Sequence, residues 1–192
     1  FAYGIVQHLG RAPDTVLIPC GGGAGMVAAH DAFREMFAAG VIDRMPRLVG
    51  VQLQACDPTA RAFHEGRDAV TPVDKKPSLS DAIMNNNPYW GRYCLQSVRE
   101  TGGTMISVSD ADFIRTIREL GREEGLFTEP AGSVSVAALR YLVKVPGFEN
   151  PGLTVCNLTG HGLNVPQVAT DESETPGVIP PTVEAVEAFL QS

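Results

Sequence analysis

Short apolar runs alternate with amphipathic stretches along the chain, and this alternation predicts an α/β fold. Continuous runs of β-branched and other large apolar residues predict strands at 15–20, 47–55, 104–109 and 153–158. Apolar residues spaced three or four positions apart predict helices at 1–9, 26–39, 58–66, 91–100, 110–120 and 131–143, with a short one at the C-terminus. Because strands and helices alternate, we expect an open, mostly parallel, twisted sheet with helices on both of its faces.

Glycine, proline and short polar side chains mark where these elements begin and end. Gly10 and Gly40 are placed to stop the first two helices. Ser109 or Asp110 is expected to cap the helix that Gly121 or Gly125 ends, and Pro130 suits the first turn of the next helix. The segments 71–77 and 85–88 are predicted to be loops because they are rich in proline and asparagine.

The chain has 192 residues, which is the length of one ordinary domain with one core. Residues 1–166 are predicted to form the α/β domain, and 167–192 a proline-rich linker followed by the C-terminal helix. The chain lacks an initiating Met and its first ten residues read as a helix already under way. We therefore expect it to be the C-terminal portion of a longer protein.

Composition and charge narrow the class of partner. The net charge is −7 with no basic run longer than Lys75-Lys76, which disfavours nucleic acid as a partner. No apolar stretch is long enough to span a bilayer and no secretory signal opens the chain, so no membrane partner is expected. Four cysteines without a CxxC spacing indicate reduced, partly buried thiols and favour a cytoplasmic setting; they are Cys20, Cys56, Cys94 and Cys156.

A glycine run between a strand and a helix is the strongest local signal for chemistry. It consists of Gly21, Gly22, Gly23, Ala24 and Gly25. Bare backbone N–H groups at a helix N-terminus attract a phosphate, so the run predicts anion binding; a tight turn with nothing bound is the alternative. Met26 stands where the third glycine of a dinucleotide fingerprint belongs, and no Lys-Ser/Thr pair of a Walker loop follows.

A second signal follows the last predicted strand, at Thr159-Gly160-His161-Gly162. Glycines there allow close approach of the backbone to a ligand, and the Thr159 hydroxyl can donate or accept a hydrogen bond, for example with a ring nitrogen. His161 is interpreted as an ordinary surface histidine, and histidine spacing predicts no metal site. Among the acidic residues before Pro130, Glu123 and Glu124 are typical of a solvated face. Glu129 could instead face a ligand-binding cleft. No G-x-S-x-G pattern supports a serine hydrolase.

Five segments resemble the threonine synthase family, whose members are fold-type II pyridoxal-phosphate enzymes with a tryptophan synthase β-like fold. In the family's order they are IPCGGGAGM at 18–26, NPYW at 87–90, TGGTMISVSD at 101–110, EGLFTEP at 124–130 and LTGHGL at 158–163. The glycine loop alone is shared by the whole fold type, but its combination with the other four is more specific. The resemblance covers most of 1–166 and implies the large, cofactor-carrying domain.

The resemblance also implies roles for particular residues. Gly21, Gly22, Gly23, Ala24 and Gly25 would hold the phosphate of pyridoxal 5′-phosphate, Thr159 would hydrogen-bond the pyridine nitrogen, and 80–83 would run near the ring face. The Schiff-base lysine is expected upstream of Phe1, because neither Lys75, Lys76 nor Lys144 has the family's sequence context. The full-length protein is expected to be a homodimer that converts O-phospho-L-homoserine, a small phosphorylated amino acid, and water to L-threonine and phosphate, whereas this chain alone is expected to be inactive.

Departures from the family pattern leave the reaction open. The family has Asn near the middle of the glycine loop, where Gly22 or Gly23 stands here. It often has Gly-Asn-Pro where this chain has 86–88, and Lys-Asp-Pro where it has 164–166. The alternatives are a related β-replacement or elimination, such as cysteate synthase or a threonine or serine dehydratase, and a noncatalytic fragment that binds a phosphate-bearing ligand.

Overall fold

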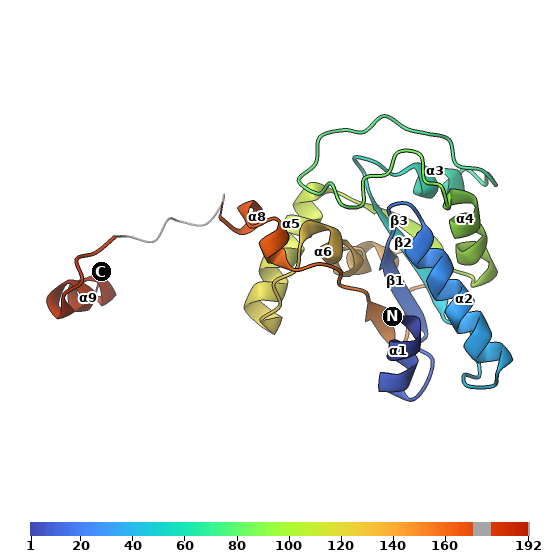
Figure 1. Cartoon of the computed structure of the whole chain (residues 1–192), viewed down its shortest axis with the longest axis horizontal. Helices are drawn as coiled ribbons and strands as arrows, with labels where there is room; N and C mark the ends of the chain where they lie inside the picture. The colour runs from blue at the N-terminus through green and yellow to red at the C-terminus, as the bar shows by residue number, and fades with distance from the viewer. Residues whose placement is uncertain (171–177, 192) are drawn as a thin grey trace.

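Four apolar strands pair in parallel and form the centre of the molecule (Figure 1). They are β1 (Thr15–Pro19), β2 (Arg47–Leu53), β3 (Thr104–Val108) and β4 (Thr154–Cys156), in the order β3-β2-β1-β4. The computed structural model describes residues 1–170 and 178–191. The predicted open parallel sheet is confirmed, and β1, α2 and β2 form the predicted βαβ unit.

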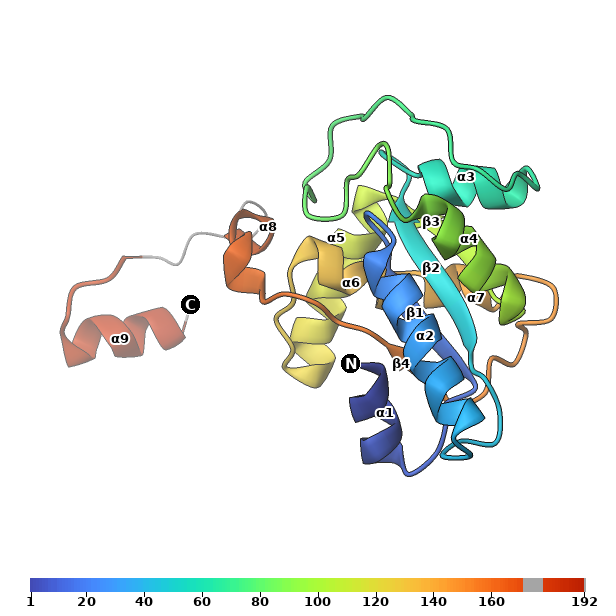
Figure 2. The same ribbon diagram turned by 45° about the vertical axis from the view of Figure 1, so that its right-hand side comes forward.

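Alternating side chains of the strands pack on two separate cores, one on each face of the sheet. On β1, Val16 and Ile18 face one core and Leu17 the other. The Val16 core is covered by α1 (Ala2–Leu9), α2 (Ala24–Ala38), α3 (Pro58–His64) and α4 (Gly91–Glu100). The Leu17 core is covered by α5 (Asp110–Glu119), α6 (Pro130–Ala137) and α7 (Leu139–Leu142). Figures 1 and 2 show the two helical layers with the sheet between them.

The order of the strands reverses once, between β1 and β4. After β1 the chain adds β2 and then β3 on one side, and it returns through α5, α6 and α7 to place β4 on the other side of β1. In open α/β sheets a crevice forms at such a reversal, outside the carboxyl ends of the two strands, and ligands bind there. The glycine run follows β1 and Thr159 follows β4, so both predicted signals flank this point.

Several predicted boundaries shift for local reasons. The helix expected at 26–39 begins at Ala24, because Gly23 is its N-cap. The strand expected to reach residue 55 ends at Leu53, whose carbonyl accepts from the Cys56 N–H in a tight turn. The helix expected over 131–143 is divided between α6 and α7 at Ala138, which keeps helical torsion angles (φ −67°, ψ −20°).

The C-terminal part contains two short helices. α8 (Gln167–Thr170) places Val168 in the Leu17 core, beyond the predicted domain boundary at 166. The linker prediction falls partly on 171–177, which lie outside the described residues; 178–182 carry no helix or strand. The predicted terminal helix is α9 (Val183–Leu190), which lies apart from the sheet and its helices in both ribbon views and buries no residue. No helix among the described residues is long and apolar enough to cross a membrane.

Ser109 follows β3 and caps α5; it is one of the two predicted caps. Its hydroxyl accepts from the Asp112 N–H, and the Asp112 carboxylate accepts in return from the Ser109 N–H at 3.0 Å, which completes a capping box. Burial raises the pKa of Asp112, but hydrogen bonds from Ser109 and Tyr141 outweigh it and leave the pKa lowered. Beyond α5, a π-helix (Leu120–Glu124) leads to Gly125, which has a left-handed conformation and is the predicted stop.

Replacing Ser109 by Ala should lower the free energy of unfolding by about 1 kcal/mol, because the Asp112 N–H loses its acceptor and the Asp112 carboxylate loses the hydroxyl donor. Urea unfolding measures this change. Thr182→Ala is the matched control: Thr182 also caps a helix through its hydroxyl, but that helix, α9, buries nothing. An equal loss of stability in both variants would show that the capping box contributes nothing beyond local helix formation.

Candidate functional site

The glycine run forms the turn between β1 and α2 and presents backbone N–H groups. Gly23 has a φ of 92°, in the left-handed region that favours glycine, and is the N-cap of α2. The N–H groups of Gly21, Gly22 and Gly23 donate to no acceptor among the described residues. The first turn of any helix adds N–H groups without intrahelical partners and a partial positive charge. The turn therefore offers several convergent donors to an anion.

A second segment, 83–90, packs directly on this turn and explains why it needs glycine. A Cβ on Gly21 would lie 3.1 Å from the Ile83 Cα, and one on Gly23 would lie 3.1 Å from the Trp90 Cβ. The Trp90 N–H donates to the Gly22 carbonyl at 3.1 Å, which anchors the two segments to each other. These contacts join residues far apart in sequence, and no local pattern signals them.

Thr159 lies on the other side of the strand reversal. The β1–β4 ladder continues past β4 to Asn157, whose N–H donates to the Leu17 carbonyl at 3.0 Å. Thr159 follows two residues later, is exposed, and its hydroxyl has no hydrogen bond to another described residue. A Cβ on Gly132 would lie 2.1 Å from the Thr159 carbonyl oxygen, so this glycine is what lets α6 approach the Thr159 backbone.

The loop after Thr159 is held by Glu129. A Cβ on Gly160 (φ 71°) would collide with the Glu129 carboxylate, which also accepts from the Asn164 side chain at 2.7 Å. Glu129 thus borders the Thr159 loop. His161 is exposed, and its Nδ1 accepts from the Leu163 N–H at 3.2 Å within a short turn. His161 thus lies at the surface, as predicted. Among the described residues no group of metal-ligating side chains is found.

The segment 78–80 is fixed by a residue that the sequence pattern marked only as a helix cap. The Asp110 carboxylate accepts from the Ser78 hydroxyl and from the Leu79 N–H, both at 2.8 Å. Ser80, beside them, is 2% exposed, and its hydroxyl has no hydrogen-bond partner in the part of the chain that the structure describes. This orphaned polar atom lies three residues before Ile83, in the segment that packs on the glycine turn.

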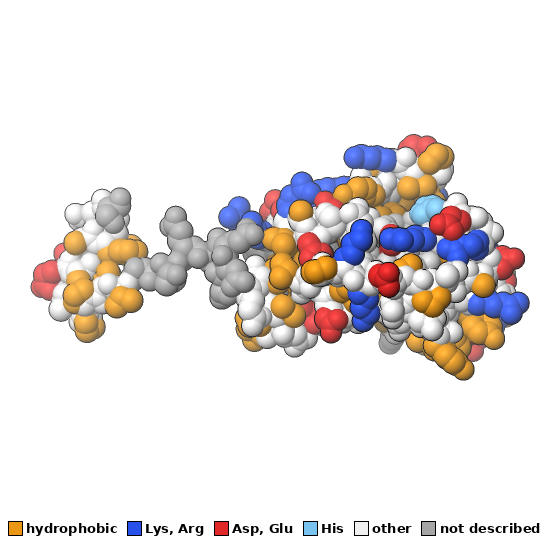
Figure 3. Space-filling model, turned by 90° about the horizontal axis from the view of Figure 1, so that it is seen from above, with side chains coloured by type: hydrophobic (Ala, Val, Ile, Leu, Met, Phe, Trp, Pro, Cys, Tyr) orange, Lys and Arg blue, Asp and Glu red, His pale blue; other side chains and the backbone are white. Residues whose placement is uncertain are grey.

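Three lysines occur in the chain, and none is built into this site. Lys75 and Lys76 are exposed on the loop after α3, and Lys144 is exposed after α7, with its Nζ 6.0 Å from the centre of the Tyr141 ring. Figure 3 shows the face of the molecule that lies at the top in Figure 1. Lys and Arg side chains alternate there with Asp and Glu side chains, so this face has no large patch of one charge.

The four cysteines are free, as predicted. The Sγ atoms of Cys20, which immediately precedes the glycine turn, and Cys94 lie 3.4 Å apart. The hydrogen bond to Cys20 raises the pKa of Cys94, and burial raises the pKa of Cys156 to about 12. Buried thiols with raised pKa values are poor nucleophiles.

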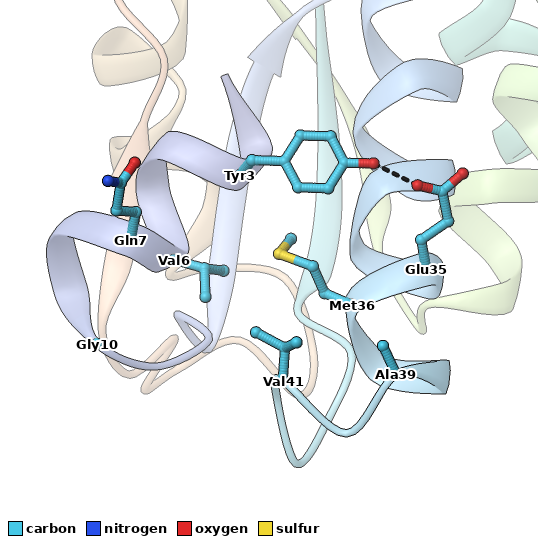
Figure 4. Close-up of a pocket in the computed structure, with 8 residues that line it drawn as sticks. All are labelled: Tyr3, Val6, Gln7, Gly10, Glu35, Met36, Ala39 and Val41. Atoms are coloured by element: carbon cyan, nitrogen blue, oxygen red, sulfur yellow. Dashed lines mark hydrogen bonds between the residues drawn. The ribbon is translucent and has the colours of Figure 1, made fainter.

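A pocket of about 630 Å³ lies between α1 and the end of α2 (Figure 4). Its lining is mostly apolar and includes Val6, Met36 and Val41, while the Tyr3 hydroxyl donates to Glu35 across one side. α2 begins at the glycine turn, and its 15 residues place the pocket about 20 Å from that turn. It is therefore separate from the strand reversal.

The family model described as "Pyridoxal-phosphate dependent enzyme" matches residues 1–160, which include the glycine turn and Thr159. The chain belongs to this family. The resemblance to threonine synthases is also confirmed. The chain is 34% identical over 176 residues to the threonine synthase of Methanosarcina acetivorans, covering 92% of the chain and 44% of that protein. It is 37% identical over 175 residues to that of Synechocystis, covering 90% and 42%. It spans less than half the length of these relatives.

Solved structures confirm the predicted fold of this pyridoxal-phosphate family. A threonine deaminase from T.th. has a TM-score of 0.63 and 19% identity, with coverage of 91% of this chain and 56% of that one. Maize serine racemase has a TM-score of 0.71 and 13% identity, with coverage of 88% and 50%. At these identities the likeness concerns the fold alone. Pyridoxal phosphate is the cofactor of the family.

Proposed function

We propose that the full-length protein is a pyridoxal-phosphate dependent lyase that converts O-phospho-L-homoserine and water to L-threonine and phosphate. The observation that carries the proposal is the pairing of the glycine turn and Thr159 across the strand reversal between β1 and β4. The threonine synthase relatives support this choice of reaction.

In this proposal the glycine turn holds the cofactor phosphate through Gly21, Gly22, Gly23, Ala24 and Gly25. Their backbone N–H groups suit a dianion, because those of the first three have no acceptor in the described chain and the N-terminus of α2 adds a positive potential. No side chain is needed, and the packing of Trp90 and Ile83 leaves no space for one at Gly21 or Gly23. The turn therefore fits the phosphate.

Thr159 is proposed to hydrogen-bond the ring nitrogen. Its hydroxyl is exposed and has no partner among the described residues, so a ligand atom can take the bond. When bound, the cofactor supplies a ring that stabilises negative charge on carbon. A hydroxyl is neutral, so it does not hold the ring nitrogen protonated as a carboxylate would. The Thr159 hydroxyl would therefore leave the ring a weaker acceptor of electrons than a carboxylate partner would.

The lysine that carries the cofactor and the residues that grip the substrate are proposed to come from a segment upstream of Phe1. The three lysines of this chain are exposed and lie on loops or after a helix, which suits a surface role. The chain alone is proposed to be inactive because it would lack that lysine and those substrate-binding residues. Assembly as a homodimer and a cytoplasmic location stay predictions.

A dehydratase or ammonia-lyase is the second candidate. The observation in its favour is the departure from the threonine synthase pattern in the glycine loop, where Gly22 or Gly23 stands in place of the family's Asn. The fold is compatible with this reaction, since the L-serine ammonia-lyase of Rhizomucor miehei shares it at a TM-score of 0.68. Cysteate synthase chemistry would use the same cofactor site. A noncatalytic fragment would bind a phosphate-bearing ligand through the turn without a lysine.

The proposed function is tested on the full-length protein by borohydride reduction, peptide mapping and turnover. We expect one pyridoxyl group, on a lysine upstream of Phe1, and release of phosphate from O-phospho-L-homoserine together with threonine. Release of ammonia from threonine or serine would instead assign a dehydratase reaction, and sulfite incorporation into phosphoserine would assign a cysteate synthase reaction. Either result would leave the proposed cofactor site unchanged. Absence of any pyridoxyl adduct would favour the noncatalytic fragment.

Gly25→Asp should weaken binding of pyridoxal phosphate by about 100-fold, because a carboxylate in the first turn of α2 repels the phosphate. A Cβ on Gly25 meets no atom within 4 Å, and acidic residues stabilise helix N-termini, so the fold should not suffer. Gly25→Asn is the neutral control of the same shape. Spectroscopic titration of the full-length apoprotein gives both affinities, and equal values would contradict phosphate binding by the turn.

Thr159→Val should weaken cofactor binding by about fivefold and change the absorption spectrum of the bound cofactor, because one hydroxyl is lost while the shape is kept. Thr159→Ser retains the hydroxyl and should restore both properties. Thr159 is exposed, so the urea midpoint should stay unchanged in either variant. An unaltered spectrum in Thr159→Val would remove Thr159 from the ring nitrogen.

A further inference from the structure

Gln52 is a polar side chain at the centre of the sheet, on β2, and it is completely buried (0% exposed). All three of its hydrogen bonds go to backbone atoms. Its Nε2 donates to the Cys20 carbonyl at 3.0 Å, and its Oε1 accepts from the N–H groups of Thr59 and Ala60, each at 2.9 Å. The side chain therefore ties β2 to the end of β1 and to the start of α3.

The bond to Cys20 replaces the sheet ladder where β1 ends. The Cys20 N–H still donates to the Val51 carbonyl at 2.8 Å, as in a regular strand pair. The Cys20 carbonyl instead accepts from the Gln52 side chain. The next residue is Gly21, the first of the glycine turn. In a planar trans peptide the C=O and N–H groups point in opposite directions, so fixing this carbonyl toward Gln52 turns the Gly21 N–H away from it.

The two bonds to α3 fix the orientation of the amide. Asp57 is the N-cap of α3 but makes no capping bond, because its carboxylate accepts from Arg61 at 2.7 Å and from Ser107 at 3.0 Å. Gln52 Oε1 takes this place and receives the N–H groups of the first turn. With two donors on one side and a carbonyl on the other, the amide has one favourable orientation.

We propose that Gln52 is a positioning residue for the glycine turn: its amide braces the Cys20–Gly21 peptide against α3 and so aims the Gly21 N–H at the cofactor phosphate. The proposal rests on the proposed function of that turn. A hydrocarbon side chain of equal size would fill the same space but leave the Cys20 carbonyl without this donor. Loss of the Gln52 amide should therefore weaken binding of the cofactor phosphate in particular, in addition to any effect on packing.

The test compares two cofactors in the full-length protein: pyridoxal phosphate and pyridoxal, which lacks the phosphate. The dissociation constant of pyridoxal divided by that of pyridoxal phosphate measures how much the phosphate contributes to affinity. A loss of affinity that is common to both cofactors cancels in this ratio. In Gln52→Met we expect this ratio to fall by about tenfold, the effect of one misplaced charge-assisted hydrogen bond. The phosphorus NMR shift of the bound phosphate should move toward that of free cofactor.

Two control variants separate the brace from stability. Gln54→Met makes the same chemical change at an exposed position two residues further along. Arg61→Gly weakens α3 from an exposed position without contact to Cys20. Both should keep the wild-type ratio. If Gln52→Met fails to fold, Gln52→Leu removes the amide with a smaller apolar side chain and adds no charge. The same fall in ratio is expected.

The outcomes distinguish this proposal from the proposed function. A lower ratio in the Gln52 variants with an unchanged ratio in the controls supports the brace. An unchanged ratio in a Gln52 variant, with both affinities reduced equally, overturns it and makes Gln52 a packing residue. A ratio near one in the wild-type protein overturns phosphate binding by the glycine turn itself, and the brace with it.

Discussion

The reversal of strand order between β1 and β4 is the constraint on which the rest of the structure depends. Because the sheet grows from β1 first toward β3 and then back to β4, the helices that follow these strands lie on opposite faces. The carboxyl ends of β1 and β4 are thus left uncovered side by side. The glycine turn and Thr159 lie at that edge, and there they present N–H and hydroxyl groups that have no partner among the described residues.

The strand reversal decides where the turn lies, whereas tertiary contacts decide its backbone conformation. The backbone of 83–90 packs on it from outside, and the Gln52 amide holds its first peptide from within the sheet. Asp110 fixes the neighbouring segment through Ser78 and Leu79. The turn itself contributes no side-chain bond, so its shape is determined by its neighbours.

Patterns along the sequence predict the elements well where the determinant is local. The apolar runs of β1 and β3, the cap at Ser109 and the stop at Gly125 depend on a few adjacent residues, and the structure confirms them. The site is predicted only in part, because the roles of Gln52 and Asp110 arise from strand pairing and loop packing over 31 to 32 positions. A Gln between the apolar residues Val51 and Leu53 of a predicted strand was the available signal for the first. Nothing local distinguishes the second from an ordinary helix cap.

The contact between Trp90 and the glycine turn has an optical consequence. Trp90 is the only tryptophan of this chain, it is 40% exposed, and its backbone N–H group is bonded to Gly22. Its indole is flanked by the rings of Tyr89 and Tyr93, at centroid distances of 5.6 and 5.8 Å. Within this chain, tryptophan emission thus originates beside the turn, where the fold places an intrinsic fluorophore against the Gly22 backbone.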